Sequence, residues 1–329
     1  MSSFNQQIID AVDNLADRLI AVSRDIHAHP ELNYEEHHAH DLLTGVLSEF
    51  GLDVTPHAYG VDTAFEAVVG DPGAPEVLVL LEYDALPGIG HGCGHNVIAA
   101  AGLGAGLVAA SFARDLGGRV RILGTPAEEG GGGKIAMARN GAFSSGVAAM
   151  MIHPADADLI KMDSIAIHTV DVLYEGKAAH AAAAPWEGRN ALDAAVLGYM
   201  NIAALRQHIR PTERIHGIIT EGGEKPNIVP RRAAATWYVR SDTISTLQPL
   251  KQRVMNCLEG ATSACGCTMS SDWDDHTYAD VRDNMAVVNS FVHNMASLGR
   301  LVRDPRTDGR AVMGSTDMGN VSYLLPSIH

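Results

Sequence analysis

Apolar residues near the N-terminus recur every three or four positions, the spacing of one face of an α-helix. They are Ile8, Val12, Leu15 and Leu19. A second helical pattern runs from Glu35 to Phe50 and stops at Gly51, a residue type that is common just after a helix end. We therefore predict two amphipathic helices on the surface of the molecule.

Three short, unbroken apolar runs follow, with the pattern of strands that are buried on both faces of a parallel sheet. The runs are Val77–Leu81, Val120–Leu123 and Val147–Ile152. Between the first two lies an uncharged stretch, Val97 to Ala113, that is mostly Ala and Gly. Because it falls short of the ~20 strongly apolar residues of a membrane span, we predict a buried helix packed closely on the sheet.

From about Ser164 the pattern changes to strands and helices in the order β-α-β-β-α-β, which is that of a ferredoxin-like sandwich. The predicted elements are strand Ile165–Glu175, helix Asn190–His208, strands Arg214–Thr220 and Ala233–Arg240, helix Thr243–Gly260 and strand Cys267–Asp272. The first fold resumes near Tyr278, with a helix at Met285–Leu298. The predicted fold class is thus α/β: a three-layer main domain with a mostly parallel sheet over residues 1–164 and 278–329, and an inserted α+β domain over residues 165–277.

Length and composition are those of about two ordinary folded domains. The chain has 329 residues, of which 46% are hydrophobic and 19% are charged, and its net charge is -15. This acidic balance argues against a nucleic-acid-binding surface, which is usually basic. The four cysteines form no CxxC pair and no disulfide framework, and the first residues lack the basic and apolar regions of a signal peptide. We expect a cytoplasmic protein.

Polar residues follow each of the three predicted parallel strands. They are Glu82, Asp84, Cys93 and His95 after the first strand, Glu128 and Glu129 after the second, and His153 directly after the third. Ligands of open α/β sheets bind at the carboxyl ends of the strands, so we expect these side chains to converge. Thiolate, imidazole and carboxylate donors together suggest a transition-metal site, with zinc as the first candidate.

The adjacent carboxylates Glu128 and Glu129 are expected to point different ways, so that one holds metal while the other stays free. Zinc lowers the pKa of water to about 7, and a free carboxylate beside it relays the proton, as amide hydrolysis requires. Asp84 is better placed to orient a ligand imidazole. Each residue alone has an ordinary alternative: a lone His is usually structural, a Glu-Glu pair is usually solvated, and Cys93 can be a small buried hydrophobe.

Other signals are weaker. Gly130–Gly133 with Lys134 resembles a phosphate loop, but Ile135 stands where Ser or Thr is required. The glycines of the predicted helix at 97–113 lie inside the helix, so they are not a dinucleotide-binding turn. The histidines of the second helix are interpreted as a solvated helix face. They are His37, His38 and His40.

Taken together, the motifs resemble the aminoacylase and carboxypeptidase-G-like metallopeptidases, in their amidohydrolase branch. The most specific are Gly90-His-Gly-Cys-Gly-His-Asn96 and Gly124-Thr-Pro-Ala-Glu-Glu129. The others are His27-Ala-His-Pro-Glu-Leu32, Glu82-Tyr-Asp-Ala-Leu-Pro87, His153-Pro154, Gly176-Lys-Ala-Ala-His180, Asn227-Ile-Val-Pro230 and Gly314-Ser-Thr-Asp317, so the likeness covers nearly the whole chain. Within this branch the chain is similar to aminobenzoyl-glutamate hydrolases and β-alanyl-lysine-type dipeptidases.

The resemblance implies a divalent metal cofactor, two zinc ions with manganese or cobalt as alternatives. The implied ligands are Cys93, His95, Glu129 and His153. Glu128 would then be the general base and later the general acid. The resemblance also implies that the main domain is the catalytic domain and that the inserted domain is a lid through which two chains form a homodimer.

The resemblance also assigns roles within the inserted domain. His180 matches a histidine that, in relatives, reaches the reaction centre of the partner subunit and stabilises the developing oxyanion. Asn227 and Arg240 match lid positions that hold the carbonyl and the carboxylate of the substrate. The ordinary alternatives are an exposed turn for His180 and a surface strand position for Arg240.

The C-terminus departs from the family pattern. Relatives continue beyond a Pro-Ser-Ile-His segment and supply a last histidine ligand, whereas this sequence stops at His329. The favoured explanation is a chain truncated at its C-terminus, because an edge strand and a closing helix are also missing from the pattern. The two alternatives are that His329 substitutes for the last ligand, and that one metal position is incomplete.

The expected function is that of a metal-dependent amidohydrolase or dipeptidase. Its substrate would be a small N-acyl or aminoacyl amino acid with a free carboxylate. An aminoacylase acting on N-acyl amino acids is one alternative, and a non-catalytic dimeric binding protein with an incomplete metal site is another. We expect neither nucleic acid nor a membrane as a partner.

Overall fold

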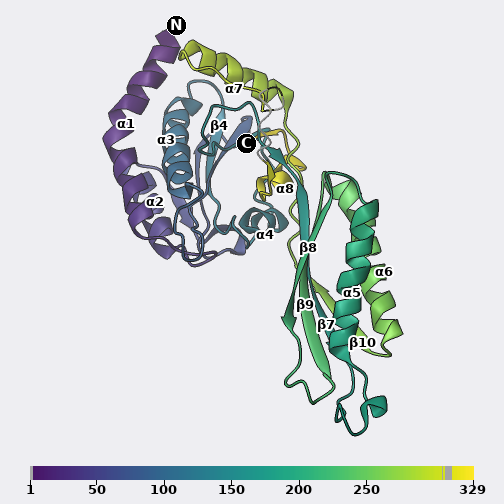
Figure 1. Ribbon diagram of the computed structural model, residues 1–329. Coiled ribbons are helices and arrows are strands. Elements are labelled where there is room, and N and C mark those ends of the chain that lie inside the picture. Colours follow the sequence, from purple (N-terminus) through teal and green to yellow (C-terminus); the bar gives the residue numbers. More distant parts are fainter. Residues whose placement is uncertain (1–2, 306, 308–312) are drawn as a thin grey trace. The chain divides into compact units, whose positions relative to one another are not determined.

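The computed structural model describes residues 3–305, 307 and 313–329. The chain divides into two compact units (Figure 1). Unit 1 comprises residues 1–164 and 281–329, and unit 2 comprises residues 165–280. Each unit has its own hydrophobic core and is described by itself.

A six-stranded sheet forms the centre of unit 1. In spatial order its strands are β1 (Val54–Pro56), β2 (Phe65–Gly70), β4 (Arg119–Gly124), β3 (Glu76–Leu81), β5 (Ala148–Met150) and β12 (Ser327–Ile328). The pairs β4–β3, β3–β5 and β5–β12 are parallel, whereas β2 is antiparallel to both of its neighbours. The sheet is therefore mixed, although its described strands run in one direction with the exception of β2.

Strands β3, β4 and β5 correspond to the three apolar runs of the sequence. The sequence pattern does not predict β1 and β2. Strand β2 contains Glu66 and alternates between buried and half-buried positions at its start, so it lacks the unbroken apolar run of a central strand. A strand of three residues such as β1 is too short to show any period.

Helices cover both faces of this sheet, which makes unit 1 a three-layer α/β structure. Helices α1 (Ser3–Ala28), α2 (His37–Glu49) and α3 (His95–Ala113) share one core cluster with Val79 and Leu81 of β3. On the other face, α4 (Gly133–Arg139) and α8 (Met318–Ser322) pack in a second cluster with Leu78 and Leu80. Helix α7 (Met285–Ser297) packs beside β12.

Helix α3 lies between α1 and the sheet (Figure 1), as the Ala- and Gly-rich sequence predicts. A Cβ at Gly102 would lie 2.9 Å from the carbonyl oxygen of Leu80, so this close approach requires glycine. The helix is long and apolar enough to cross a membrane, but 67% of its residues in the most apolar window are buried inside the unit. It has the burial of a core helix.

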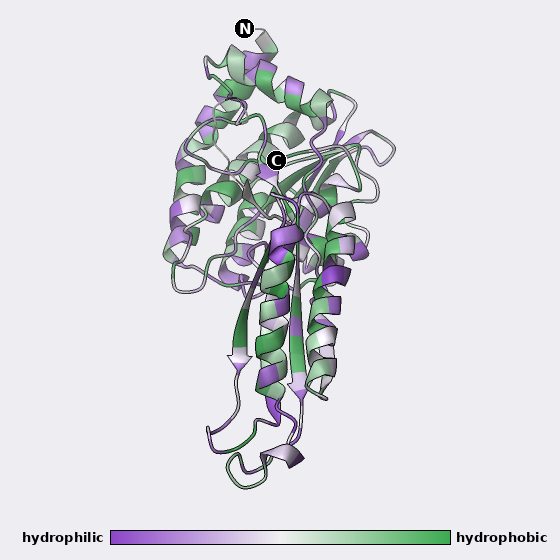
Figure 2. Ribbon diagram, turned by 45° about the vertical axis from the view of Figure 1, so that its right-hand side comes forward, coloured by the Kyte–Doolittle hydropathy of each residue, from purple (hydrophilic) through white to green (hydrophobic). Residues whose placement is uncertain are grey.

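Unit 2 has one antiparallel sheet covered by two helices. Its elements are β7 (Ala166–Glu175), α5 (Ala191–Leu205), β8 (Arg214–Glu221), β9 (Arg232–Ser241), α6 (Ile244–Ala264) and β10 (Thr268–Trp273). The spatial strand order is β10-β7-β9-β8, and every pair is antiparallel. Hydrophobic and hydrophilic residues are interspersed along both helices (Figure 2), and the apolar ones pack on the sheet.

Side-chain caps define the start of both helices of unit 2. Asn190 accepts hydrogen bonds from the first turn of α5, and Thr243 forms a capping box with Thr246 at the start of α6. The order of elements is the one expected from the sequence, and the last residues of unit 2 lie three positions beyond the predicted boundary. Its function as a lid or dimerisation domain stays a prediction.

Candidate metal centre

The loops that follow β3, β4 and β5 carry the polar residues singled out in the sequence. Since these strands are parallel neighbours, their carboxyl ends open at one edge of the sheet. Gly94 brings two of the loops together. It has φ of 79° and lies between Cys93 and His95, and a Cβ there would meet the ring of Pro154 at 2.7 Å. Pro154 directly follows His153.

His95 is the first residue of α3 and lies among buried carboxylates. Its Nε2 is 3.7 Å from Oε2 of Glu82, 3.8 Å from Oε2 of Glu128 and 3.7 Å from Oε1 of Glu129. Burial alone would lower the pKa of His95, but the hydrogen bond to Asp84 and the nearby carboxylates raise it to about 9. The surroundings of Nε2 therefore favour a positive charge.

Asp84 connects two parts of the site. Its Oδ1 lies 3.1 Å from Nδ1 of His95, and its Oδ2 accepts the backbone N–H of Glu129 at 2.9 Å. With Nδ1 as the donor, the imidazole keeps Nε2 turned toward the carboxylates. Burial would raise the pKa of Asp84, but the bonds to His95 and the backbone hold it below its usual value. This geometry suits the orienting role that the sequence suggests.

Glu128 and Glu129 follow a residue with unusual backbone geometry. Ala127 has φ of 59°, a left-handed conformation that costs a non-glycine residue of the order of 1 kcal/mol or more. Both carboxylates approach Nε2 of His95, and the expectation that one holds metal while the other stays free remains a prediction. Burial and the charges of Glu82 and Asp317 raise the pKa of Glu128 well above its ordinary value.

Glu36 supports this turn and was not singled out in the sequence. Its buried carboxylate accepts the backbone N–H of Ala127 at 2.8 Å through Oε1, and the hydroxyl of Thr63 at 2.7 Å through Oε2. Burial is the main reason that its pKa rises to about 7. The residue lies just before α2, far from Ala127 in sequence, and no local pattern marks it.

A buried ion cluster lies beside the carboxylates. Lys134 at the start of α4 binds a carboxylate oxygen of Glu82, and its Nζ is 2.6 Å from Oδ1 of Asp317. The backbone N–H of Lys134 also donates to Oδ2 of Asp317 at 2.9 Å. All three side chains are completely buried. The lysine of the sequence that resembles a phosphate loop therefore pairs with two buried carboxylates.

Three more residues considered in the sequence analysis lie around His95 and the carboxylates. The Cys93 thiol is hydrogen-bonded to Glu129. Burial is the main cause, and this hydrogen bond the second, of a rise in the pKa of Cys93 to about 12. The ring of His153 is centred 5.9 Å from that of His95 and 5.8 Å from that of His329. Burial lowers the pKa of His329 to about 4, so this imidazole is neutral.

The donor set fits a divalent transition metal. Glu82, His95 and Glu128 offer ligand atoms within 4.8 Å of one another, and this group shares only His95 with the ligands that the resemblance implies, which stay a prediction. The buried Nε2 atoms of His95 and His329 have no hydrogen-bond partner among the described residues, and the same holds for Oε2 of Glu82. Buried polar atoms rarely stay unpaired, and nitrogen, sulfur and oxygen donors together suit zinc and its neighbours. A coordinating thiol is deprotonated by the ion, which would reverse the raised pKa of Cys93.

The predicted residues of unit 2 fall into two groups. His180 is exposed, and its Nδ1 accepts the backbone N–H groups of Ala182 and Ala183 at 3.2 Å. The residue after it bonds to the carbonyl of Asn227, so these two loops lie side by side. Arg240 is near the opposite end of β9, with a buried Nε that lacks a partner within the described chain.

The sequence profile of peptidase family M20/M25/M40 matches residues 79–328. The chain belongs to peptidase family M20. This M20 protein is 44% identical over 336 residues to the Xaa-Arg dipeptidase of Mus musculus, with 97% of this chain and 77% of the mouse protein covered. It is 33% identical to a p-aminobenzoyl-glutamate hydrolase of Escherichia coli K12, with 83% of this chain and 61% of the bacterial protein covered.

Solved structures show the same M20 fold. A Bacillus subtilis protein described as a dinuclear metal-binding peptidase of the M20 family superimposes with a TM-score of 0.73 at 19% identity, covering 96% of this chain and 88% of that one. The family resemblance predicted from the motifs is confirmed. The protein is a hydrolase that acts on amide bonds of small substrates with a divalent metal, so the non-catalytic alternative is set aside.

Proposed function

We propose that this M20 hydrolase is a two-zinc dipeptidase whose metal ligands are Cys93, His95, Glu129 and His153. The observation that carries the proposal is the convergence of loops from three parallel strands around Nε2 of His95. We also propose that His329 completes the donor set, and its position beside His153 supports this. A divalent cation bound there polarises the amide carbonyl and lowers the pKa of water.

Glu128 is the general base in this proposal. Its carboxylate is buried beside His95, where a proton is held more tightly than in water. It takes the proton from the attacking water and delivers it to the nitrogen of the leaving amine. Asp84 keeps His95 oriented while this happens.

The proposed substrate is a dipeptide with a free carboxylate and a basic C-terminal residue. The support is the extent of the similarity to the Xaa-Arg dipeptidase, which includes 97% of this chain. The alternative, an aminoacylase-type hydrolase of N-acyl amino acids, is favoured by weaker similarity to an N-acetyl-L-cysteine deacetylase of Bacillus subtilis, 26% identical. Parallel assays with an Xaa-Arg dipeptide, an N-acetyl amino acid and aminobenzoyl-glutamate separate these substrates.

We also propose a homodimer through unit 2, which the distances within that unit support. His180 and Asn227 lie together before β9 begins, whereas Arg240 is eight residues along β9 from Arg232, about 26 Å at ~3.3 Å per residue. One copy of unit 2 therefore does not bring both groups to one small substrate. We infer that a second copy supplies His180 and Asn227, and that Arg240 binds the carboxylate. The free cysteines suit the proposed cytoplasmic location.

The test of the proposed function is Glu128→Gln. Hydrolysis of the preferred dipeptide should fall on the order of 100- to 10000-fold, because the proton relay is lost. Zinc content, measured on the same samples, should stay at the wild-type level. Glu259→Gln, an exposed change on α6, is the matched control and should leave both quantities unchanged. Most of the turnover surviving in Glu128→Gln would overturn the role given to this carboxylate.

A further inference from the structure

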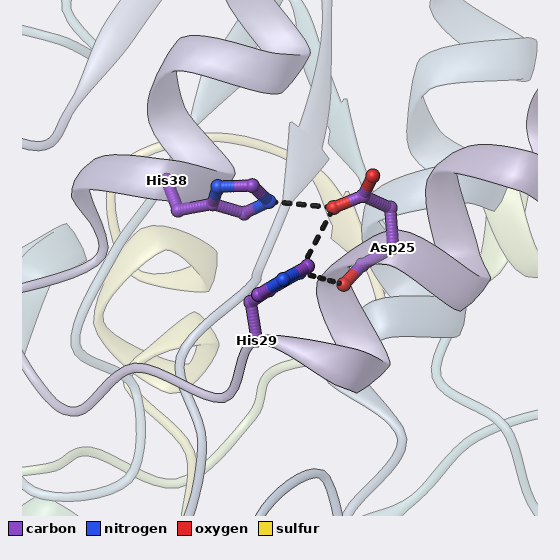
Figure 3. A group of neighbouring side chains, drawn as sticks. All are labelled: Asp25, His29 and His38. Atoms are coloured by element: carbon purple, nitrogen blue, oxygen red, sulfur yellow. Dashed lines mark hydrogen bonds and ion pairs between the residues drawn. The ribbon is translucent and has the colours of Figure 1, made fainter.

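A second group of metal-ligating side chains lies where helix α1 ends and helix α2 begins in unit 1. Its members are Asp25, His29 and His38, which are drawn in Figure 3. One carboxylate oxygen of Asp25, Oδ1, lies 2.5 Å from Nε2 of His38 and 3.1 Å from Nδ1 of His29. The two imidazole rings are centred 4.3 Å apart. Both rings thus converge on one carboxylate.

This arrangement differs from the interpretation of the histidine run as a solvated helix face. His38 turns toward α1, and His40 is buried, whereas His37 is exposed and belongs to no such group in the described chain. The three cluster members are partly accessible, with side-chain exposures of 41% for Asp25, 56% for His29 and 42% for His38. An ion and its water ligands can therefore reach them.

The backbone holds the three donors in place before any ion arrives. Asp25 is in the last turn of α1, and His29 directly follows the helix, where its backbone N–H donates to the carbonyl of Asp25 at 3.2 Å and keeps the two residues together. His38 lies in the first turn of α2, where the carboxylate of Glu31 accepts the backbone N–H groups of His38 and Ala39 at 2.8 and 3.0 Å. This cap fixes the position of His38 relative to α1.

The distances and donor types suit zinc. Two nitrogen or oxygen ligands at about 2.0–2.2 Å from a tetrahedral zinc lie roughly 3.3–3.5 Å from each other. The separation of 3.1 Å between His29 and Asp25 is close to this value, whereas the 2.5 Å between His38 and Asp25 is a short hydrogen bond that has to lengthen when an ion enters. Two imidazoles with one carboxylate are a common zinc donor set. The hydrogen bonds from both histidines keep the pKa of Asp25 below its usual value, so the carboxylate is ionised at neutral pH.

We propose that Asp25, His29 and His38 form a separate zinc site, with water completing the coordination, that links the end of α1 to the start of α2. None of the three belongs to the proposed catalytic centre, so this site goes beyond the proposed function. The ion replaces the three hydrogen bonds of the cluster, two from His29 to the side chain and backbone carbonyl of Asp25 and one from His38 to the Asp25 side chain, by three metal–ligand bonds. Binding to the folded chain alone then raises the stability of unit 1.

The test compares His38→Ala with its neighbour His37→Ala, which removes an exposed histidine outside the cluster. Zinc alone is the probe, in equilibrium dialysis followed by metal analysis. Wild type and His37→Ala should each bind one equivalent more than His38→Ala. Zinc should also raise the Tm of the first two proteins more than that of His38→Ala. His29→Ala is a second variant and should behave like His38→Ala.

Equal zinc content in all four proteins would overturn the proposal. Dipeptide hydrolysis measured on the same samples separates it from the proposed function, because His38→Ala should hydrolyse at the wild-type rate. A loss of more than one equivalent together with loss of hydrolysis would show that the cluster is not a separate site. Loss of hydrolysis in Glu128→Gln alone bears only on the proposed function.

Discussion

At the scale of single residues, the sequence points to candidate metal ligands but not to the residues that hold them in place. Asp84, Cys93 and His95 are found because their types and strand-end positions point to metal chemistry. Glu36 escapes notice, because a carboxylate is expected at the surface unless a distant contact is known. Its contact with Ala127 joins residues 91 positions apart, which no local pattern reveals.

The buried carboxyl of Glu36 should make stability depend on pH. Its pKa is about 7 in the folded protein and near 4.5 without burial, so the folded state holds a proton that the unfolded state has lost between these values. The contribution of Glu36 to stability should therefore be fully present below pH 4.5, fall as pH rises to about 7 and then level off. The loss should be on the order of 3 kcal/mol.

Glu36→Gln should remove this part of the pH dependence, because the amide does not titrate. Urea unfolding at several pH values between 4.5 and 8 measures it, with the exposed neighbour Glu35→Gln as the control. The control should follow the wild-type curve. A Glu36→Gln curve that also follows wild type would contradict the assignment.

Removal of the buried lysine should be costly. Lys134→Met leaves Glu82 and Asp317 close together and buried, without the ammonium group that neutralises both, and should lower the free energy of unfolding by roughly 3–5 kcal/mol. The exposed control Lys177→Met should change it by less than about 0.5 kcal/mol. Adding Glu82→Gln to Lys134→Met should recover part of the loss. Chemical denaturation measures the free energy of unfolding of the two single variants and the double variant. A loss below about 1 kcal/mol in Lys134→Met would refute the role of Lys134 in neutralising the two carboxylates.

At the scale of elements, period and run length predict most of the helices and the central strands. The prediction succeeds for α1, α2 and α3 because amphipathic or continuous apolar patterns extend over many turns. It fails for β2, because the mixed polar and apolar pattern of this strand does not indicate a strand unless its pairing with β4 is known. Strand pairing is a long-range property, and the residues of β2 alone do not show that it pairs with β1 on one side and β4 on the other.

Two glycines should respond in opposite ways to the same substitution. Gly102→Ala in α3 places a methyl group 2.8 Å from Leu81 and 2.9 Å from the Leu80 carbonyl, and should destabilise by about 1–3 kcal/mol. Gly45→Ala in α2 meets nothing within 4 Å and should stabilise by about 0.5–1 kcal/mol. The midpoints of urea unfolding measure both changes in stability, provided that the dependence of the unfolding free energy on urea concentration is the same in each variant. Equal effects of the two changes would contradict the close packing of α3.

At the scale of the whole molecule, the sequence predicts two domains with an insertion, and the chain divides into two units at closely similar positions. A homodimer in which His180 reaches the partner subunit is implied by the family resemblance alone and stays a prediction. The distances within unit 2 supply the argument for a dimer, since His180 and Arg240 are far apart in one copy.

Mixing two inactive variants tests whether His180 acts across a dimer. His180→Ala and Glu128→Gln should each have little activity alone. Mixed dimers contain one site with both residues intact, so random reassociation should restore about a quarter of the wild-type rate. Hydrolysis that never exceeds the sum of the two variants would show that His180 does not serve a second copy.

The most direct test of the account is a crystal structure of the protein grown with zinc, with anomalous data collected at the zinc edge. The account predicts a strong peak within about 2.0–2.3 Å of donor atoms of Cys93, His95, Glu129 and His153. A map in which these side chains point apart, with no anomalous peak between them, would contradict it.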